Sequence, residues 1–291
     1  MSFFKKISSK IKAYFFAPIY TKLTILNDAI LDSRFDEVKK NILHEMPENM
    51  VKYGQKCYSA GEEDGIIAAI FNKIKPDEKV FLEIGSGFGL ENNTHFMLLS
   101  GWKGTWVDGN NQFIKTVSSK LGGSTFSKLL IKNCFVDSNN IKQLFSETLV
   151  HFNTKEIDFF SIDIDGNDYA VTESMFSKEI FPKVICVEYN GKYPYPCKVK
   201  VPQVETFVWN NDDYMGVSLG AWVSLFSSYQ YTLLCCDATG NNAFFIRSEF
   251  AHLFQCYSPE QLYQPARYYL VRRRIGHSAS LKFLKDVLHN D

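Results

Sequence analysis

Three glycines spaced two apart lie between a strand-like and a helix-like run, and this loop constrains the fold more than any other part of the 291-residue chain. The run from Lys79 to Ile84 is short and rich in apolar residues, and the loop Gly85-Ser-Gly87-Phe-Gly89 follows it directly. Asn93 or Thr94 can then cap a helix that runs to Ser100. A glycine loop at a strand-to-helix junction indicates a ligand-binding α/β sheet, because glycine lets the backbone approach a ligand closely.

Strand-like and helix-like patterns alternate from residue 61 onward, which predicts parallel strands joined by crossover helices. We expect strands in the segments 79–84, 105–108, 129–136, 157–164, 183–188, 231–236 and 243–247, and helices over 66–74, 93–100, 141–150 and 219–228. Six turn-type residues, 237–242, join the last two strands, which is too short for a crossover helix, so this pair must be antiparallel. The predicted fold class is α/β, a Rossmann-like, mostly parallel sheet of seven strands with an antiparallel last strand and an N-terminal helical extension.

Four parts are predicted along the chain: a basic amphipathic segment over 1–22, a helical extension over 23–60, the α/β domain over 61–250, and a C-terminal helical extension over 251–291. In the first part, aromatic and Ile residues recur at helical spacing and the lysines mostly avoid that stripe. Such a helix favours peripheral contact of residues 1–20 with an anionic membrane surface, or packing against the domain or a second copy in a homo-oligomer. Both alternatives stay open.

Composition narrows the class of partner and the compartment. Lys plus Arg and Asp plus Glu both number 32, so the net charge of zero argues against a broad basic face, and we expect no nucleic-acid partner. Seven cysteines without a C-x-x-C pair favour reduced thiols in a cytoplasmic protein. The basic N-terminus lacks a small-residue cleavage site, so no secretory signal is expected. The predicted location is the cytoplasm, with the inner face of the membrane as a candidate peripheral site.

The glycine spacing points to the kind of cofactor. A dinucleotide fingerprint, G-x-G-x-x-G, would need glycine at position 90, where the chain has Leu90. The observed G-x-G-x-G with an acid two residues upstream better suits a cofactor that has a cationic sulfonium, an amino-acid tail and no phosphate, namely S-adenosylmethionine. Asp108, at the tip of the second strand, can bind ribose hydroxyls. The predicted cofactor-binding residues are Glu83, Gly85, Ser86, Gly87, Gly89, Asn93, Thr94, Asp108, Gly109, Phe135 and Asp163.

A second group of polar residues follows the fourth and fifth predicted strands. Asp165, Asn167 and Asp168 follow the fourth strand, and Glu188 and Asn190 leave the fifth, so the carboxyl edge of a parallel sheet would bring them together, with Asp163 supporting the strand end. The alternative, a turn that caps the next helix, explains only some of these acids. One carboxylate could act as a general base, or several oxygens could hold Mg²⁺. The predicted catalytic residues are Asp165, Glu188, Asn190 and, as a weaker candidate, His95; the candidate metal ligands are Asp165, Glu188 and Asn190.

These motifs resemble the FkbM-like methyltransferases, in particular a bacterial set associated with capsule and lipopolysaccharide gene clusters. The matching segments lie between about residues 55 and 250: 61–65, 92–94, 101–104, 161–169, 187–190 and 239–245. The chain is also similar to macrocin-type sugar O-methyltransferases, which hold Mg²⁺ with a D-G-D step and paired acids. Here the first motif reads Asp165-Gly-Asn167 and keeps only the first acid, and Glu188-Tyr-Asn190 replaces the paired acids. These departures put metal dependence in doubt.

The resemblance implies a class I methyltransferase fold and O-methylation of a small-molecule sugar or glycan-linked substrate used in surface-polysaccharide biosynthesis. Two other functions stay open. A nicotinamide-dependent oxidoreductase could use the same sheet, although Leu90 and the terminal hairpin count against it. A non-catalytic binding subunit is the other, which the complete glycine loop and the acids disfavour.

Overall fold

The computed structural model describes residues 2–204, 207, 209–273 and 275–290, with side chains from residue 16 onward. In this part of the chain a seven-stranded sheet has the order β3-β2-β1-β4-β5-β7-β6. Its first five strands are parallel, and β7 runs antiparallel to both β5 and β6. The strands are β1 (Val80–Ile84), β2 (Lys103–Asp108), β3 (Leu129–Asn133), β4 (Phe159–Ile162), β5 (Val184–Glu188), β6 (Tyr231–Cys236) and β7 (Asn242–Arg247). This order confirms the predicted Rossmann-like, class I methyltransferase fold.

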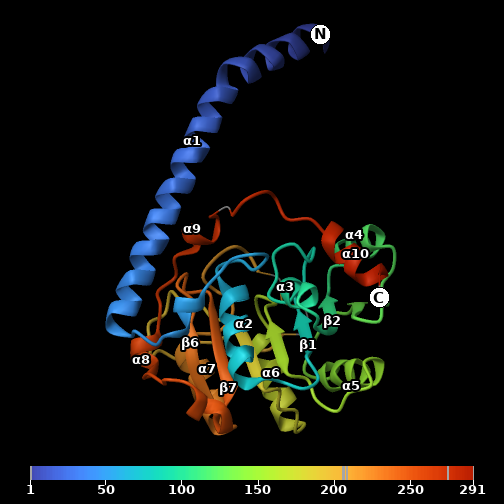
Figure 1. The fold of residues 1–291 in the computed structure, drawn as a ribbon, viewed down its shortest axis with the longest axis vertical. Coiled ribbons are helices and arrows are strands. Elements are labelled where there is room, and N and C mark those ends of the chain that lie inside the picture. The colour runs from blue at the N-terminus through green and yellow to red at the C-terminus, as the bar shows by residue number, and fades with distance from the viewer. Residues whose placement is uncertain (1, 205–206, 208, 274, 291) are drawn as a thin grey trace.

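Helices cover both faces of the sheet (Figure 1). The α-helices are α1 (Ser2–Glu45), α2 (Glu63–Ile74), α3 (His95–Leu99), α4 (Asn111–Leu121), α5 (Ile141–His151), α6 (Asp168–Ser177), α7 (Leu219–Ser228), α8 (Pro259–Leu262), α9 (Tyr268–Val271) and α10 (Lys282–His289), and the 3₁₀ helices are η1 (Met50–Tyr53) and η2 (Ser248–Leu253). The four predicted helices correspond to α2, α3, α5 and α7. Helix α4 was not predicted, because its exposed face is polar and only three of its side chains are buried.

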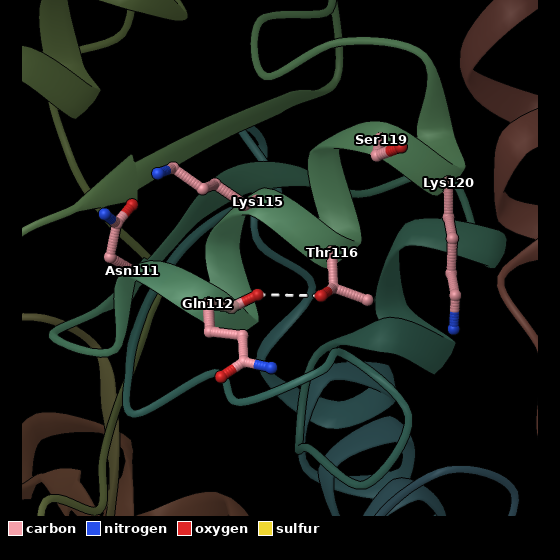
Figure 2. A pocket seen from close by; sticks show the side chains of 6 residues that line it. All are labelled: Asn111, Gln112, Lys115, Thr116, Ser119 and Lys120. Atoms are coloured by element: carbon pink, nitrogen blue, oxygen red, sulfur yellow. Dashed lines mark hydrogen bonds between the residues drawn. The ribbon is translucent and has the colours of Figure 1, made fainter.

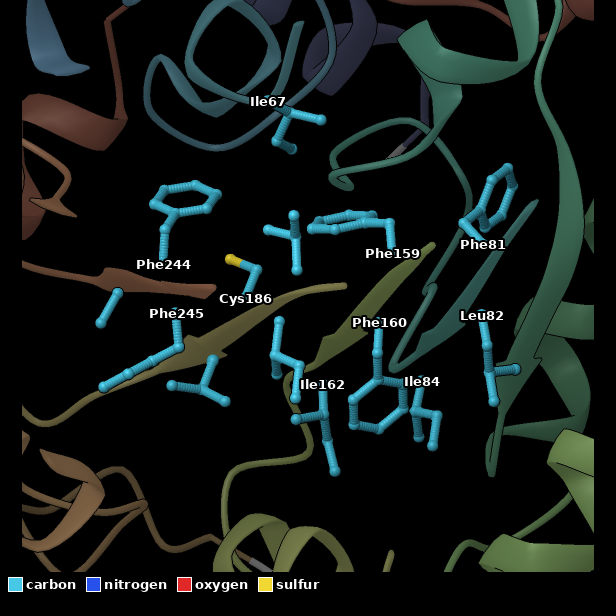
Figure 3. Close-up of a cluster of buried hydrophobic side chains, with 14 of the residues drawn as sticks. Ile67, Phe81, Leu82, Ile84, Phe159, Phe160, Ile162, Cys186, Phe244 and Phe245 are labelled. Carbon is cyan, nitrogen blue, oxygen red and sulfur yellow. The ribbon is translucent and has the colours of Figure 1, made fainter. Parts of the chain in front are cut away.

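Alternate residues of the central strands pack on opposite faces of the sheet. Figure 3 shows Phe81, Phe159, Cys186 and Phe244 on one face below Ile67 of α2, and Leu82, Ile84, Phe160, Ile162 and Phe245 on the other. The ring of Phe245 stacks on Phe226 of α7, with centroids 3.9 Å apart. Strands β4 and β5 lie in the middle of the sheet and are buried on both faces except at Glu188, as their nearly continuous apolar sequence predicts. This packing fixes the strand ends that carry the site.

Helix α1 crosses the predicted boundary between residues 22 and 23 without interruption. It bends in its N-terminal part and projects beyond the domain (Figure 1), and Pro18 lies inside it. A proline in a helix interior removes one backbone hydrogen bond and kinks the helix. In the described residues, no helix is long and apolar enough to cross a membrane. Beyond residue 250 the predicted helical extension consists of three short helices, α8 to α10, joined by irregular chain.

Candidate functional site

A cavity of ≈ 810 Å³ opens at the carboxyl ends of β1, β2, β4 and β5, on the edge where α/β sheets bind ligands. It is lined by Ile84, Gly85, Gly87, Asp108, Gly109, Asn110, Phe113, Cys134, Phe135, Val136, Asp163, Ile164, Asp165, Asn167, Glu188, Phe207, Trp209 and Asn211. Both groups of residues that the sequence singled out therefore contribute to one cavity. The parallel register explains this, because Ile84 pairs with Val107 on one side and with Ile162 on the other.

Gly87 is the glycine of the loop whose backbone faces open space. Its φ is +55°, and a Cβ placed on it would meet nothing within 4 Å. Gly85 and Gly89 differ, because a Cβ on Gly85 would overlap the Asp163 carbonyl oxygen and one on Gly89 would lie 2.5 Å from the Trp106 ring. The loop therefore needs glycine at 85 and 89 for packing, and at 87 it leaves room beside the cavity.

Asp108 holds the glycine loop against the end of β2. Its carboxylate accepts a 2.8 Å hydrogen bond from the Gly87 N–H and a 2.7 Å hydrogen bond from the Asn110 N–H. Each carboxylate oxygen can accept more than one hydrogen bond, so the half-buried side chain can still accept from ligand hydroxyls. Gly109 and Phe135 lie beside it on the cavity wall, where a Cβ on Gly109 would contact the Phe135 ring at 3.3 Å.

Three carboxylates converge on the opposite wall of the cavity. Oxygen atoms of Asp163, Asp165 and Glu188 all lie within 4.8 Å of one another, although the residues come from the ends of two strands. Asp165 adopts a left-handed backbone conformation with φ of +63°, which turns the chain sharply after β4. Asp168 stabilises this turn, because its Oδ1 accepts a 2.9 Å hydrogen bond from the Ile164 N–H. The turn and the convergence of acids, treated as alternatives in the sequence, are therefore both present, but the turn does not cap α6, since Asn167 at its N-cap position makes no capping side-chain hydrogen bond.

The crowding of these acids favours their protonated forms. Asp163 lines the cavity, where desolvation by the surrounding protein and the charges of Asp168 and Asp165 raise its pKa to about 8. Burial and the charge of Asp163 raise the pKa of Glu188 well above its usual range. One Glu188 oxygen, Oε2, is buried without a hydrogen-bond partner in the described structure. The pair can thus share a proton at neutral pH, and it has unused capacity toward a ligand.

Four acids line the cavity, and the described lining residues include no Lys or Arg. The cavity also lacks a helix N-terminus aimed at it from the glycine loop. Residues 85–94 form turns and bends, and α3 begins only at His95, which is fully buried. A dinucleotide site instead directs an early helix N-terminus at the pyrophosphate. The electrostatics of this cavity therefore favour a cationic ligand over one with phosphates.

Several predicted cofactor residues lie behind the loop rather than at the cavity. Glu83 is buried, and its two oxygens accept from the Asn92 side chain, the Asn93 N–H and the Thr94 hydroxyl. Asn93 also donates to Ser161 Oγ at 3.0 Å. Thr94 stands at the N-cap position of α3, but its side chain makes no capping hydrogen bond; its oxygen accepts from Trp106 Nε1 at 2.7 Å and its hydroxyl donates to Glu83. These residues and the buried Ser86 shape the loop, and ligand contact by them stays a prediction.

His95 and Asn190 do not join the three carboxylates. The His95 ring is buried and stacked on Tyr58, with centroids 3.6 Å apart, and burial lowers its pKa to about 4. Asn190 donates two 3.1 Å hydrogen bonds to the carbonyl oxygens of Asp213 and Met215, and its Oδ1 accepts from the Lys192 N–H. The side chain of Asn190 is therefore committed to the backbone, so its predicted role as a metal ligand does not fit the structure.

Aromatic residues from a later loop complete the cavity, and the sequence did not identify them. Phe207 and Trp209 line it, and a Cβ on Gly166 would overlap the Phe207 ring. Asn167 anchors this loop, because its side chain donates to the Val204 carbonyl at 2.8 Å and accepts from the Val204 N–H at 3.2 Å. Gly166 and Phe207 are about 40 residues apart, and contact over such a separation leaves no local sequence pattern. The only sequence signal for these cavity residues was the cluster of aromatic residues over 207–214.

A second hollow, of ≈ 700 Å³, lies along α4 (Figure 2). It is lined by Asn111, Gln112, Lys115, Thr116, Ser119 and Lys120, all from this helix. The hydroxyl of Thr116 donates a 2.7 Å hydrogen bond to the Gln112 carbonyl, which is an internal contact of the helix. Side chains from a single exposed helix face do not converge on a ligand, so this hollow is not a candidate site.

No protein-family model and no curated protein sequence matches the chain. Solved structures with a similar fold include an O-methyltransferase from Bacillus cereus in complex with SAH, at 14% identity and a TM-score of 0.41, over 74% of this chain and 89% of that one. A putative O-methyltransferase from Klebsiella pneumoniae has 13% identity and a TM-score of 0.39, over 72% and 87% of the two chains. A S-adenosylmethionine-dependent methyltransferase from Clostridium acetobutylicum has 10% identity and a TM-score of 0.39, over 66% and 92%. The FkbM-like resemblance stays a prediction.

Proposed function

We propose that the chain is a S-adenosylmethionine-dependent methyltransferase that methylates a hydroxyl group of a sugar or glycan-linked acceptor in surface-polysaccharide biosynthesis. The observation that carries the proposal is the cavity itself. One wall of the cavity has the open backbone of Gly87 and the ribose-binding candidate Asp108, and the other wall has a group of carboxylates. The described lining of the cavity contains no basic residue. A cationic sulfonium with a nucleoside fits this charge distribution, and a pyrophosphate does not.

Each wall of the cavity has a separate task in this proposal. Asp108 accepts hydrogen bonds from the ribose hydroxyls, and the Phe135 ring, half exposed to the cavity, offers an apolar surface to the adenine. The carboxylates near Asp163 stabilise the positive sulfonium. Phe207 and Trp209 line the cavity on the side of Gly166, away from Phe135, and the apolar face of a sugar ring can stack on these aromatic rings.

The chemistry needs an acceptor proton to leave. S-adenosylmethionine, when bound, would supply an electrophilic methyl group to the acceptor oxygen and would leave as S-adenosylhomocysteine. Asp165 takes the hydroxyl proton, since burial raises the pKa of its carboxyl and a base with a raised pKa binds the transferred proton more strongly. The backbone at Asp165 holds its carboxylate beside Glu188, with the Asp165 carbonyl accepting a 2.9 Å hydrogen bond from the Gly216 N–H.

A divalent cation is the second candidate for this wall. Asp163, Asp165 and Glu188 supply the hard oxygen ligands that Mg²⁺ prefers, and their oxygens are close enough to share one ion. This set replaces the one predicted from the sequence, because Asp163 takes the place of Asn190. An ion there would remove the repulsion among the three acids and would lower the pKa of a bound hydroxyl.

Two measurements test the proposal. Calorimetry with S-adenosylmethionine and with NAD should show binding of the first and none of the second; the reverse would indicate an oxidoreductase. Methyl transfer from labelled cofactor should then be assayed against nucleotide sugars and glycan extracts. Cofactor binding without transfer to any acceptor would favour the non-catalytic binding subunit.

A further inference from the structure

Large apolar side chains are exposed along the projecting half of α1. Spacings of three and four residues place them on one face of the helix. They are more than half exposed: Phe16, Ile19, Tyr20, Leu23, Leu26 and Ile30. Ile25 is also exposed but lies off this stripe. We call this set the α1 stripe.

A different face of the same helix attaches it to the domain. Leu31, Phe35 and Ile42 are buried in the core, and α9 packs against the helix. The Arg273 guanidinium lies 4.1 Å from the centre of the Phe35 ring, and it also pairs with Asp32. The part of α1 from Leu31 onward is therefore held by the domain, and the preceding part, with the stripe, projects from it (Figure 1).

The projecting half has no described contact that would explain its apolar surface. Helices in proteins derive most of their stability from packing of an apolar face rather than from propensity. Six large side chains on one face form a continuous apolar surface, which in soluble proteins marks an interaction site rather than scattered exposure. The stripe therefore requires a partner.

Charge identifies the kind of partner. Residues 2–27 contain Lys5, Lys6, Lys10, Lys12 and Lys22 and no Asp or Glu. The following residues, 28–45, contain five acids, and the whole chain has no net charge. Positive charge is thus concentrated in the projecting half, which favours an anionic partner. Two copies of this half placed side by side in parallel would repel each other.

We propose that the α1 stripe and its lysines bind an anionic lipid surface, with the helix lying in the plane of that surface. A lipid surface supplies both an apolar layer for the stripe and negative charge for the lysines. The helix is not apolar enough to span a bilayer. Because the part of α1 from Leu31 onward is fixed to the domain, this contact would hold the whole molecule at the surface.

Vesicle sedimentation with the full chain tests this proposal. The protein should bind vesicles of phosphatidylcholine with phosphatidylglycerol, bind phosphatidylcholine alone far more weakly, and be released by salt. Leu23→Glu with Leu26→Glu should abolish binding. Val150→Glu is the matched control, since Val150 is 80% exposed on α5, and it should change nothing. Replacing Lys5, Lys6 and Lys10 with Gln should weaken binding roughly 10²-fold.

Light scattering on the same samples separates a second copy from a membrane. A monomer in solution that binds anionic vesicles supports the proposal. A dimer that the Leu23→Glu, Leu26→Glu variant dissociates, without any vesicle binding by the wild type, overturns it and makes the stripe a dimer interface. Equal binding to neutral vesicles also overturns it. Cofactor affinity in solution should be unchanged in these variants, so the outcome does not depend on the proposed function.

Discussion

The Gly87 N–H donates a 2.8 Å hydrogen bond to the Asp108 carboxylate, which ties the glycine loop after β1 to the end of β2. The two residues are 21 positions apart in the chain, and parallel pairing of β1 with β2 brings their strands together. The contact positions the open side of the loop and the carboxylate on the same wall of the cavity. Changes at either residue should therefore affect cofactor binding first.

Gly87→Leu should abolish binding of S-adenosylmethionine while the protein stays folded. The new side chain would enter the cavity, and the left-handed backbone costs about 1–2 kcal/mol for a residue with a Cβ. Gly101→Leu is the matched control, because Gly101 also has a positive φ with nothing within 4 Å of its Cβ position and lies outside the cavity lining. Calorimetry should show loss of binding in the first variant alone. Equal binding by both would contradict the assignment of the loop.

Asp108→Ala should weaken binding of S-adenosylmethionine by about 1–3 kcal/mol, the typical cost of losing a hydrogen-bonded charged partner. Asp137→Ala is the control, since the Asp137 carboxylate likewise accepts two backbone N–H bonds in a turn, from Asn139 and Asn140. Titration of the two variants with cofactor separates ligand contact from turn stability. If both lose affinity equally, Asp108 acts only on the loop.

Affinity for S-adenosylmethionine should rise with pH relative to S-adenosylhomocysteine, which lacks the sulfonium charge. Desolvation by the surrounding protein raises the pKa of Asp163 to about 8, so this carboxyl is largely protonated at neutral pH. A nearby cation favours the ionised form, so cofactor binding should release a proton and strengthen as pH approaches the pKa. For each unit by which the bound cation lowers the pKa of Asp163, we expect the ratio of S-adenosylmethionine affinity to S-adenosylhomocysteine affinity to grow roughly tenfold over this pH range. Calorimetry of both ligands between about pH 6 and pH 9 measures it, and Asp163→Asn should flatten the dependence; a constant ratio in the wild type would place the sulfonium elsewhere.

Asp165→Asn should lower kcat by about 10²- to 10⁴-fold and leave cofactor affinity nearly unchanged, because the substitution keeps shape and removes the charge. Glu188→Gln should do the same if the two act together. Asp213→Asn is the control, since Asp213 pairs with Lys192 at the surface. Chelation distinguishes the two roles: loss of activity in EDTA and recovery with Mg²⁺ would identify metal ligands, and no effect would identify a base. Full turnover in both variants would remove this wall from the mechanism.

Asn167→Ala should raise the KM for the acceptor more than that for the cofactor. Its side chain fixes the Val204 backbone by two hydrogen bonds, and the loop that follows carries Phe207 and Trp209. Asn72→Ala serves as a control, because Asn72 is exposed on α2 and lies outside the cavity lining. Steady-state kinetics with each substrate varied in turn gives both constants. A larger change for the cofactor would show that the aromatic loop covers the nucleoside instead.

The sequence by itself determined the sheet. Alternating strand and helix patterns, the glycine loop and the short connection 237–242 predicted seven strands with an antiparallel end, since these signals are local and each fixes one element or turn. It also placed Asp108, Asp163, Asp165 and Glu188 on one cavity, because the carboxyl ends of parallel strands meet at one edge.

Only the tertiary structure decided which polar side chains remain available. Glu83 and Asn190 lie at strand ends, as the cavity residues do, but other parts of the chain use their hydrogen-bonding capacity. Glu83 accepts hydrogen bonds from Asn93 and Thr94, and Asn190 donates to the backbone of 213–215. The contributions of Phe207 and Trp209 depend on how a long loop folds back over Gly166. Hydrogen bonds and contacts of this kind join groups that sequence spacing does not relate, so no periodicity or motif encodes them.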